Sequence, residues 1–361
     1  GREGGSLGMA SAVLCAMMLR RLLVGAVVLR GMLAVGAASC DLFEGSWLPA
    51  ANHSAYPPYN SSTCPFIGRE FDCMGNGRRD RRYLSYAWQP TGCNLPRFNG
   101  QEFLNQHRGK RIMFVGDSLS RNQWTSLVCM LHAAAPDTPT TVATHQSLTT
   151  LTFTEYEVRV MLHHTVYLVD VVRKRIGRVL KLDSLQGGRL WRGADMLIFN
   201  TWHWWGRRGV YLPWDYIQDG TNITRDMNRL AAFQKALSTW ARWVNAKVNP
   251  ARTQVFFQGI SPSHYNGVEW EEGSARTCRG ETEPTSGTTY PGGTPAAVRV
   301  VKRAVRATRG RVTLLDITTL SQLRKDGHPS VYGLGHGSDC SHWCLPGVPD
   351  TWNEILGALA G

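Results

Sequence analysis

The clearest pattern along the chain is an apolar run, Ile112–Val115, that stops at Gly116, Asp117 and Ser118. Its length and its β-branched residues predict a buried strand of a parallel sheet. From 119 to 131 the apolar positions recur at helical spacing, so a helix should follow directly. The end of a strand that runs into a helix is where α/β sheets present reactive groups. Ser118 is therefore the first candidate functional residue.

Strand and helix patterns alternate through the rest of the chain. Further strands are predicted at 148–164, 165–172, 196–199, 254–257 and 312–317, and further helices at 225–248 with Thr224 as N-cap, at 295–307, and from Pro349 and Asp350 onward. This alternation predicts a three-layer α/β domain with a parallel central sheet. Between two of these strands, 261–295 is rich in Gly, Ser, Thr and Pro, which indicates a long loop of the kind that often forms a substrate lid.

Composition permits one large domain, since 43% of 361 residues are hydrophobic, and the formal net charge is +13. A basic protein attracts polyanions, namely nucleic acid, an anionic membrane or a uronic-acid polysaccharide. No nucleic-acid-binding motif accompanies the charge, so nucleic acid is not expected as a partner. The basic run 78–82 could touch an acidic substrate, but such runs are more often solvated faces. We also expect Arg299, Lys302, Arg303 and Arg306 to face solvent.

Residues 1–39 form an apolar leader that Arg20, Arg21 and Arg30 interrupt, so that no single run in it spans a bilayer. Small residues precede Cys40. Basic residues, a short apolar core and a small-residue stretch are typical of a secretory signal peptide or a poor signal anchor.

Eight cysteines follow the leader, which itself holds Cys15. They are Cys40, Cys64, Cys73, Cys93, Cys129, Cys278, Cys340 and Cys344. An even count after a secretory leader predicts four disulfides, although eight cysteines allow 105 pairings and the sequence selects none. Zinc bound by Cys340, His342 and Cys344 is the competing idea, but the usual Cys-x-x-Cys spacing is missing, so we expect no metal. We predict N-glycosylation at Asn52, Asn60 and Asn222, each of which starts an Asn-x-Ser/Thr sequon.

The many turn residues and four cysteines of 40–97 predict a disulfide-pinned segment covering a catalytic domain at 98–361. Near the end of that domain, Asp339 and His342 lie three residues apart, close enough to face one point. A serine nucleophile needs such a pair, because the imidazole takes and returns the hydroxyl proton while the carboxylate orients it. Without this pair, Asp117 and Ser118 would be read as a simple helix N-cap.

Two motifs carry a family resemblance. Gly116–Trp124 (GDSLSRNQW) and Asp339–Asn353 (DCSHWCLPGVPDTWN) resemble the plant trichome birefringence-like family of cell-wall polysaccharide O-acetyltransferases, whose domain is of the SGNH, or GDSL-like, type. The segments 40–47 and 88–93 are similar to the cysteine-rich, PMR5N-like part of that family. The resemblance implies acetyl transfer through an acetyl-Ser118 intermediate, with Asp339 and His342 completing the triad. It also implies a Golgi-lumenal, signal-anchored protein, or one secreted to the wall.

Other site candidates follow the strand predicted at 196–199. Asn200 has the position of the SGNH asparagine that holds the oxyanion together with the Ser118 amide, although the fuller Gly-x-Asn-Asp form is not present. Trp202, Trp204 and Trp205 can stack on sugar rings or serve as core. His203 is expected to be a structural hydrogen-bonding residue.

Arg121 has two interpretations of equal weight: it positions substrate, or it forms a buried ion pair with Asp117. No cofactor is expected to stay bound, but the reaction needs an acetyl donor derived from acetyl-CoA, or a membrane protein that supplies it. The expected partner is a cell-wall polysaccharide, with neutral hemicellulose such as xylan favoured. The alternative is a secreted acetylesterase acting on acidic pectin. The complete set of Ser118, Asp339 and His342 argues against a catalytically silent binding protein.

Overall fold

The computed structural model describes residues 40–50, 58–209, 212–271, 276–335 and 337–361. The chain divides into two compact units, Gly1–Asp41 and Leu42–Gly361, and all the helices and strands below belong to the second. The predicted leader at 1–39 and the sequon asparagine Asn52 lie outside the described residues. Within the described ranges, every helix is too short or too polar to cross a membrane.

A seven-stranded sheet forms the centre of the second unit, in the order β13-β12-β9-β3-β6-β5-β4. Its strands are β3 (Arg111–Gly116), β4 (Thr140–His145), β5 (Leu148–Phe153), β6 (Val158–His164), β9 (Met196–Phe199), β12 (Gln254–Gln258) and β13 (Thr313–Leu315). The pairs from β13 across to β6 are parallel, and β5 and β4 add an antiparallel edge. The predicted parallel centre is confirmed. The single strand predicted at 148–164 is wrong, because β5 and β6 form a hairpin.

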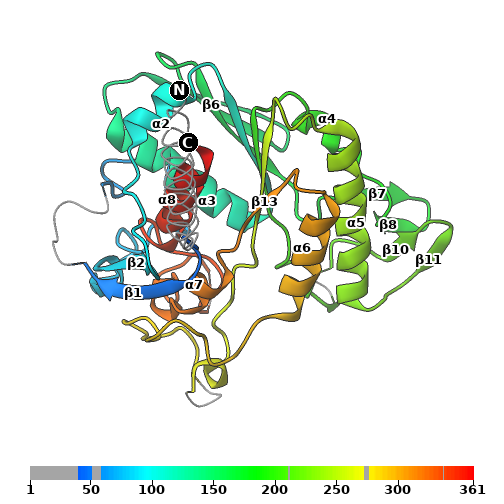
Figure 1. The fold of residues 1–361 in the computed structure, drawn as a ribbon. Coiled ribbons are helices and arrows are strands. Elements are labelled where there is room, and N and C mark those ends of the chain that lie inside the picture. Colours follow the sequence, from blue (N-terminus) through cyan, green and yellow to red (C-terminus); the bar gives the residue numbers. More distant parts are fainter. Residues whose placement is uncertain (1–39, 51–57, 210–211, 272–275, 336) are drawn as a thin grey trace, which may run out of the picture. The chain divides into compact units, whose positions relative to one another are not determined.

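Helices cover both faces of this sheet, which confirms the three-layer arrangement (Figure 1). One face carries α2 (Gly100–Gln106), α3 (Ser118–Ala134) and α8 (Val348–Ala360), and the other carries α5 (Arg229–Lys247) and α6 (Ala296–Ala307). Two further α-helices among the described residues, α4 (Gly188–Trp191) and α7 (Thr318–Gln322), are short. A strand between two helical layers must be apolar on both sides, which explains the unbroken run in β3.

The side chains of β3 alternate between two hydrophobic cores. Ile112 and Phe114 pack into the core under α3 and α8, whereas Met113 and Val115 pack into the core under α5 and α6. All four side chains are buried. Each core therefore holds β3 from one side, and the strand delivers Gly116 and Ser118 to a fixed place at its carboxyl end.

Several boundaries differ from the predictions. The predicted helix 225–248 begins at Arg229, because Asn228 is the N-cap and accepts a hydrogen bond from Ala231 N–H at 3.1 Å. Thr224 instead ends a strand in a second, four-stranded sheet that the sequence did not predict. That sheet has the order β11-β10-β8-β7, with β7 (Asp170–Lys174), β8 (Gly177–Lys181), β10 (Tyr216–Asp219) and β11 (Asn222–Thr224). The strand predicted at 165–172 is thus displaced to β7.

The cysteine-rich segment contributes the pair β1 (Gly45–Pro49) and β2 (Tyr86–Pro90). Disulfides join Cys64 to Cys129, Cys73 to Cys344, and Cys278 to Cys340. Cys40 and Cys93 are disulfide-bonded as well, so all eight cysteines after the leader are oxidised, as predicted. Two of the three ligands considered for zinc, Cys340 and Cys344, are therefore used in disulfides.

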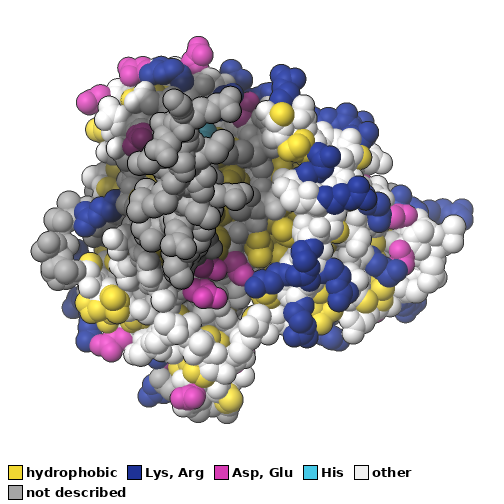
Figure 2. Space-filling view, in the orientation of Figure 1, with side chains coloured by type: hydrophobic (Ala, Val, Ile, Leu, Met, Phe, Trp, Pro, Cys, Tyr) yellow, Lys and Arg dark blue, Asp and Glu magenta, His cyan; other side chains and the backbone are white. Residues whose placement is uncertain are grey.

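The two groups of basic residues, on α6 and at 78–82, differ in their exposure to solvent. Arg299, Arg303 and Arg306 are exposed on α6, as predicted, and Lys302 pairs with Asp316 at 2.8 Å. Figure 2 shows Lys and Arg gathered over this helix.

In the run 78–82 the solvated interpretation is wrong for Arg78. Its side chain is buried over the ring of Tyr83, and it donates to the carbonyls of Asp326 at 2.8 Å and His328 at 3.1 Å. These three contacts and an ion pair with Asp80 at 3.1 Å offset the desolvation of this guanidinium. A count of charges along the sequence cannot reveal the carbonyl and ring contacts.

Candidate active site

The turn after β3 places Ser118 at the first position of α3. Asp117 caps this helix, since its Oδ1 accepts the Leu119 N–H at 2.9 Å. Gly116 is required for packing, because a Cβ there would lie 2.4 Å from both the carbonyl oxygen of Asn200 and Ser120 Oγ. The N-cap and nucleophile interpretations are thus compatible: Asp117 caps the helix and Ser118 remains half-buried and accessible.

Asp339, His342 and Ser118 form a hydrogen-bonded row. His342 Nδ1 lies 2.7 Å from Asp339 Oδ2, and His342 Nε2 lies 2.7 Å from Ser118 Oγ. The carboxylate accepts the Nδ1 proton, so the neutral imidazole turns its Nε2 lone pair toward the serine hydroxyl. This is the arrangement in which an imidazole removes a serine proton.

The electrostatics of Asp339 suit an orienting carboxylate. Burial alone would raise its pKa, but hydrogen bonds from His342 Nδ1–H and from the backbone N–H groups of Ser341 and His342 outweigh it and hold the pKa well below its usual range. Asp339 therefore stays ionised across the working range of a histidine base.

Asn122 fixes the loop of His342 to the helix of Ser118. Its side chain is fully buried, its Oδ1 accepts the Trp343 N–H at 2.8 Å, and its Nδ2 donates to the Trp343 carbonyl at 3.1 Å. Asn122 is not among the site residues predicted from the sequence. The available signal was its spacing, because a residue four positions after Ser118 lies on the same face of a helix.

The cysteine-rich segment also reaches the site. The rings of Phe71 and His342 lie 5.8 Å apart, and the Leu345 N–H donates to the Phe71 carbonyl at 2.9 Å. Arg121 pairs with Glu70 at 2.7 Å and is half-exposed. The alternative in which Arg121 forms a buried ion pair with Asp117 is wrong, because Arg121 is half-exposed and pairs with Glu70, whereas Asp117 caps α3.

Asn200 follows β9 and lies beside Gly116 in the sheet. Its N–H donates to the Val115 carbonyl at 2.9 Å, and its buried Oδ1 has no partner among the described residues. The structure thus brings Asn200 next to the turn that carries Ser118, as the sequence predicted. Its contact with an oxyanion stays a prediction.

A cavity of about 380 Å³ opens beside the row of Asp339, His342 and Ser118. Ser341 lines this cavity and lies between Asp339 and His342 in the sequence. Its lining residues include Trp202, His203, Arg207, Ser261, Ser263, Tyr265, Glu269 and Ser341. The lining thus mixes the rings of Trp202, His203 and Tyr265 with several hydroxyls, one cation and one carboxylate. Part of the loop predicted at 261–295 forms this wall.

The three tryptophans divide between the two interpretations. Trp205 is fully buried and belongs to the core, whereas Trp202 and Trp204 are half-buried. Trp202 packs on Phe233 and lines the cavity, and Trp204 lies 3.7 Å under the guanidinium of Arg207. His203 Nε2 contacts the Ser261 carbonyl at 2.8 Å, so it makes the structural hydrogen bond that was expected.

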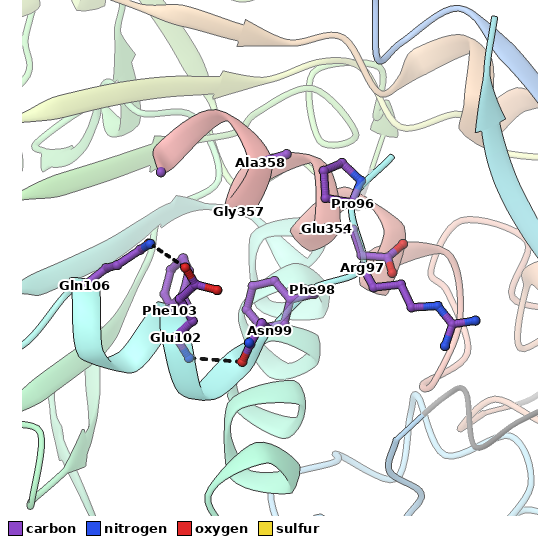
Figure 3. Close-up of a pocket in the computed structure, with 11 residues that line it drawn as sticks. Pro96, Arg97, Phe98, Asn99, Glu102, Phe103, Gln106, Glu354, Gly357 and Ala358 are labelled. Atoms are coloured by element: carbon purple, nitrogen blue, oxygen red, sulfur yellow. Dashed lines mark hydrogen bonds between the residues drawn. The ribbon is translucent and has the colours of Figure 1, made fainter. Parts of the chain in front are cut away.

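Another cavity, of about 190 Å³, lies between α2 and α8 (Figure 3). Its lining includes Arg97, Phe98, Glu102 and Glu354. Because α2 precedes β3, this cavity lies at the end of the sheet where β3 begins, opposite Ser118. It holds no nucleophile paired with a base, so it is not the reactive site.

Residues 95–359 match PC-Esterase, described as a GDSL/SGNH-like acyl-esterase family found in Pmr5 and Cas1p, and residues 38–94 match the PMR5 N terminal Domain. Protein trichome birefringence-like 41 of Arabidopsis thaliana is 58% identical over 333 residues, which cover 91% of this chain and 93% of that protein. The chain belongs to the trichome birefringence-like family.

More distant members of this family match as well. Protein trichome birefringence-like 38 of Arabidopsis thaliana is 54% identical over 91% of this chain and 86% of its own length. Protein trichome birefringence, from the same plant, is 40% identical over 88% of this chain and 55% of its own length. Membership in the trichome birefringence-like family makes the chain an enzyme of the acyl-transferring or acyl-ester-hydrolysing type that acts on polysaccharide.

Two predicted glycosylation sites can be located. Asn60 and Asn222 are both exposed, the first in a turn and the second at the start of β11. Their modification stays a prediction. Among the described residues, no group of His, Cys, Asp and Glu side chains is placed to hold a metal ion.

Proposed function

We propose that this protein is an O-acetyltransferase that transfers acetyl to hydroxyls of a plant cell-wall polysaccharide, with neutral hemicellulose such as xylan favoured. The observation that carries the proposal is the row Asp339–His342–Ser118, with 2.7 Å at each contact, beside an open cavity. Ser118 is the nucleophile, His342 the general base and acid, and Asp339 the residue that orients His342.

In the first half-reaction Ser118 Oγ attacks the acetyl carbonyl of the donor, and His342 Nε2 takes the hydroxyl proton. The bond from the carbonyl carbon to the leaving group breaks, and His342 returns the proton to that group. Acetyl-Ser118 remains. Asp339 stabilises the imidazolium that exists between the two proton transfers.

In the second half-reaction an acceptor hydroxyl loses its proton to His342 and attacks acetyl-Ser118. The bond to Ser118 Oγ breaks, and the proton returns from His342 to that oxygen. The negative charge on the carbonyl oxygen is held in both steps by the Ser118 amide at the start of α3 and by Asn200. Arg121, half-exposed above Phe71, positions substrate.

The acceptor preference rests on the cavity lining. Trp202 and Tyr265 offer ring faces for a pyranose, Trp204 supports Arg207 at the edge, and the serine hydroxyls suit sugar hydroxyls. Arg207 and Glu269 are the only Lys, Arg, Asp or Glu among the described lining residues, and their charges cancel. A neutral chain fits such a lining better than a polyuronate does.

The donor and the compartment belong to the same proposal. An acetyl donor derived from acetyl-CoA, or a membrane protein that supplies acetyl, must reach Ser118. Four disulfides fit an oxidising compartment, so we place the enzyme in the Golgi lumen with residues 1–39 as signal anchor, or in the wall after secretion.

A secreted pectin acetylesterase is the second candidate. The exposed arginines of α6 and the net charge of +13 favour an acidic polymer, and water in place of a sugar hydroxyl would turn transfer into hydrolysis. Salt separates the two, because binding driven by arginines weakens as charges are screened beyond about 10 Å at 0.1 M.

The test gives purified protein an acetyl donor with xylan-type or pectin-type oligosaccharides, and separately their acetylated forms without a donor. We expect acetyl gain on the neutral chain, and none with Ser118→Ala or His342→Ala. Because a triad acts as a unit, the double variant should be hardly worse than either single one. Acetyl loss from acidic chains, without transfer from any donor, would make the protein a pectin acetylesterase.

A further inference from the structure

Two buried histidines lie behind the catalytic loop. His264 and His328 are both at most 1% exposed to solvent. His264 Nδ1 lies 2.6 Å from His328 Nε2. The outer nitrogen of each ring meets a backbone carbonyl: His264 Nε2 lies 2.9 Å from Gln322 O, and His328 Nδ1 lies 2.6 Å from His342 O. The second carbonyl belongs to the proposed base itself.

The partners decide which nitrogens carry protons. A carbonyl only accepts, so the contact with His342 requires a proton on His328 Nδ1. A neutral His328 then has a lone pair on Nε2, which accepts a proton that His264 carries on Nδ1. A relay therefore runs from His264 to His328 to the carbonyl of His342. In the other neutral arrangement that keeps the hydrogen bond between the rings, His264 donates to Gln322 and the carbonyl of His342 loses its donor.

All three contacts of the pair, the two outer ones and the one between the rings, are complete only when the pair holds three protons on its four nitrogens. Burial opposes this third proton, since it lowers the pKa of His264 to about 4 and that of His328 well below its usual value. The charged groups that act on the pair are Asp326 and Lys325 for His264, and Asp339 and His342 for His328. Near neutral pH the pair is uncharged.

The surroundings hold the rings in place. His328 stacks on Trp343 at 4.1 Å, and His264 meets the edges of Trp270 and Tyr290. The backbone of His264 is tied to the same loop, because its N–H donates to the Cys340 carbonyl at 2.9 Å. The pair thus connects the end of α7 and the segment after β12 with the loop that carries the base.

We propose that His328 is a positioning residue for the reaction: it holds the backbone of His342 through a hydrogen bond to the His342 carbonyl, and His264 sets the tautomer that makes this bond possible. The inference rests on the proposed function, since His342 is taken as the base. Neither histidine touches substrate, so their effect passes through the orientation of His342 between Asp339 and Ser118.

The test compares His328→Asn with His328→Gln. The asparagine amide reaches the place of Nδ1 and can donate to the His342 carbonyl, whereas glutamine reaches the place of Nε2 and cannot. With p-nitrophenyl acetate as acyl donor, we expect kcat of His328→Gln to fall roughly 10- to 100-fold with little change in KM. His328→Asn should stay within about threefold of the wild type, which is the conservative rescue.

A second readout does not depend on turnover. The His342 Nδ1 proton shared with Asp339 should give a low-field proton resonance, assigned by its loss in His342→Gln. We expect His328→Gln to shift or broaden it and His328→Asn to retain it. If the wild type fails to react with any ester, the proposed function fails while this resonance still tests the positioning.

His264→Leu tests the relay without altering His328, and it covers the case in which His328→Gln does not fold. It should broaden the same resonance and lower kcat, but less than His328→Gln does. Equal losses in His328→Asn and His328→Gln would overturn the proposal, because ring packing on Trp343 would then be what matters. Wild-type kcat and an unchanged resonance in His328→Gln would overturn it too.

Discussion

Asn122 gives a sharp test of how the site is held together. Replacing it by Leu keeps roughly the same volume but leaves the N–H and the carbonyl of Trp343 without partners in a fully buried place. Each buried unsatisfied group costs about 1–3 kcal/mol, so the free energy of unfolding should fall by about 2–6 kcal/mol. The variant should be folded but clearly less stable.

Activity should fall along with stability. Trp343 follows His342, so a loop released from α3 loses the 2.7 Å contact between His342 Nε2 and Ser118 Oγ. A displacement of about 1 Å in a catalytic group can cost about 100-fold in rate. We expect a loss of this order in kcat for acyl transfer by Asn122→Leu.

Asn122→Asp refines the test. Its carboxylate can still accept the Trp343 N–H, but its second oxygen faces the Trp343 carbonyl and repels it unless the carboxyl is protonated. Burial raises the pKa of such a carboxyl above its unfolded value, so the stability it provides is present at low pH and is lost as pH rises through the folded pKa. Asn122→Asp should therefore be closer to wild-type stability at pH 5 than at pH 8.

The neighbouring Gln123 supplies the control. It is equally buried, yet neither atom of its side-chain amide has a hydrogen-bond partner among the described residues. Gln123→Met should change stability and kcat little. Urea unfolding and acyl-transfer rates measure all three variants. The reasoning would be refuted if Asn122→Leu behaved like Gln123→Met.

Two more predictions follow from covalent links and from pH. Replacing Cys73 and Cys344 by Ser should reduce both stability and turnover, because the bond closes a loop of 271 residues, worth about 5.6 kcal/mol in the chain-entropy model, and anchors the loop of the base. Removing Cys64–Cys129, worth about 4.3 kcal/mol for 65 residues, should reduce stability in urea but spare turnover. Burial raises the pKa of Asp350 to about 6, above its unfolded value, so its contribution to stability should fall as pH rises from about 4 to 6, and Asp350→Asn should flatten that part of the profile.

The local parts of the fold could be read from the sequence. The run Ile112–Val115 is recognisable as a strand because both of its faces are buried and every position is apolar. The helix after Ser118 is recognisable because its apolar residues recur at helical spacing. The hairpin of β5 and β6 was missed because the pattern of apolar residues does not separate one continuous strand from two strands joined by a tight turn. The turn includes Glu157, whose positive φ of 56° is a property of the fold and is not visible in the sequence.

The triad could be proposed because its members lie in two short motifs, but the residues that support it could not. Phe71, Glu70 and Arg78 reach the site or its loop from the cysteine-rich segment. Glu70 contacts Arg121 across 51 residues, and Phe71 and Arg78 make contacts across more than 240 residues, so no local pattern marks them. Arg78 looked like one more surface charge until its carbonyl partners were known.

The bond between Cys73 and Cys344 has a consequence for how the protein is made. When Cys73 is synthesised its partner is still 271 residues away, so its thiol must remain unreacted while most of the chain is translated. The loop of His342 is also synthesised late. It then packs against Phe71, which was synthesised near the start of the domain. The nascent chain therefore lacks the proposed base until the last part of the domain has been made, and the disulfide then fixes that part to the first.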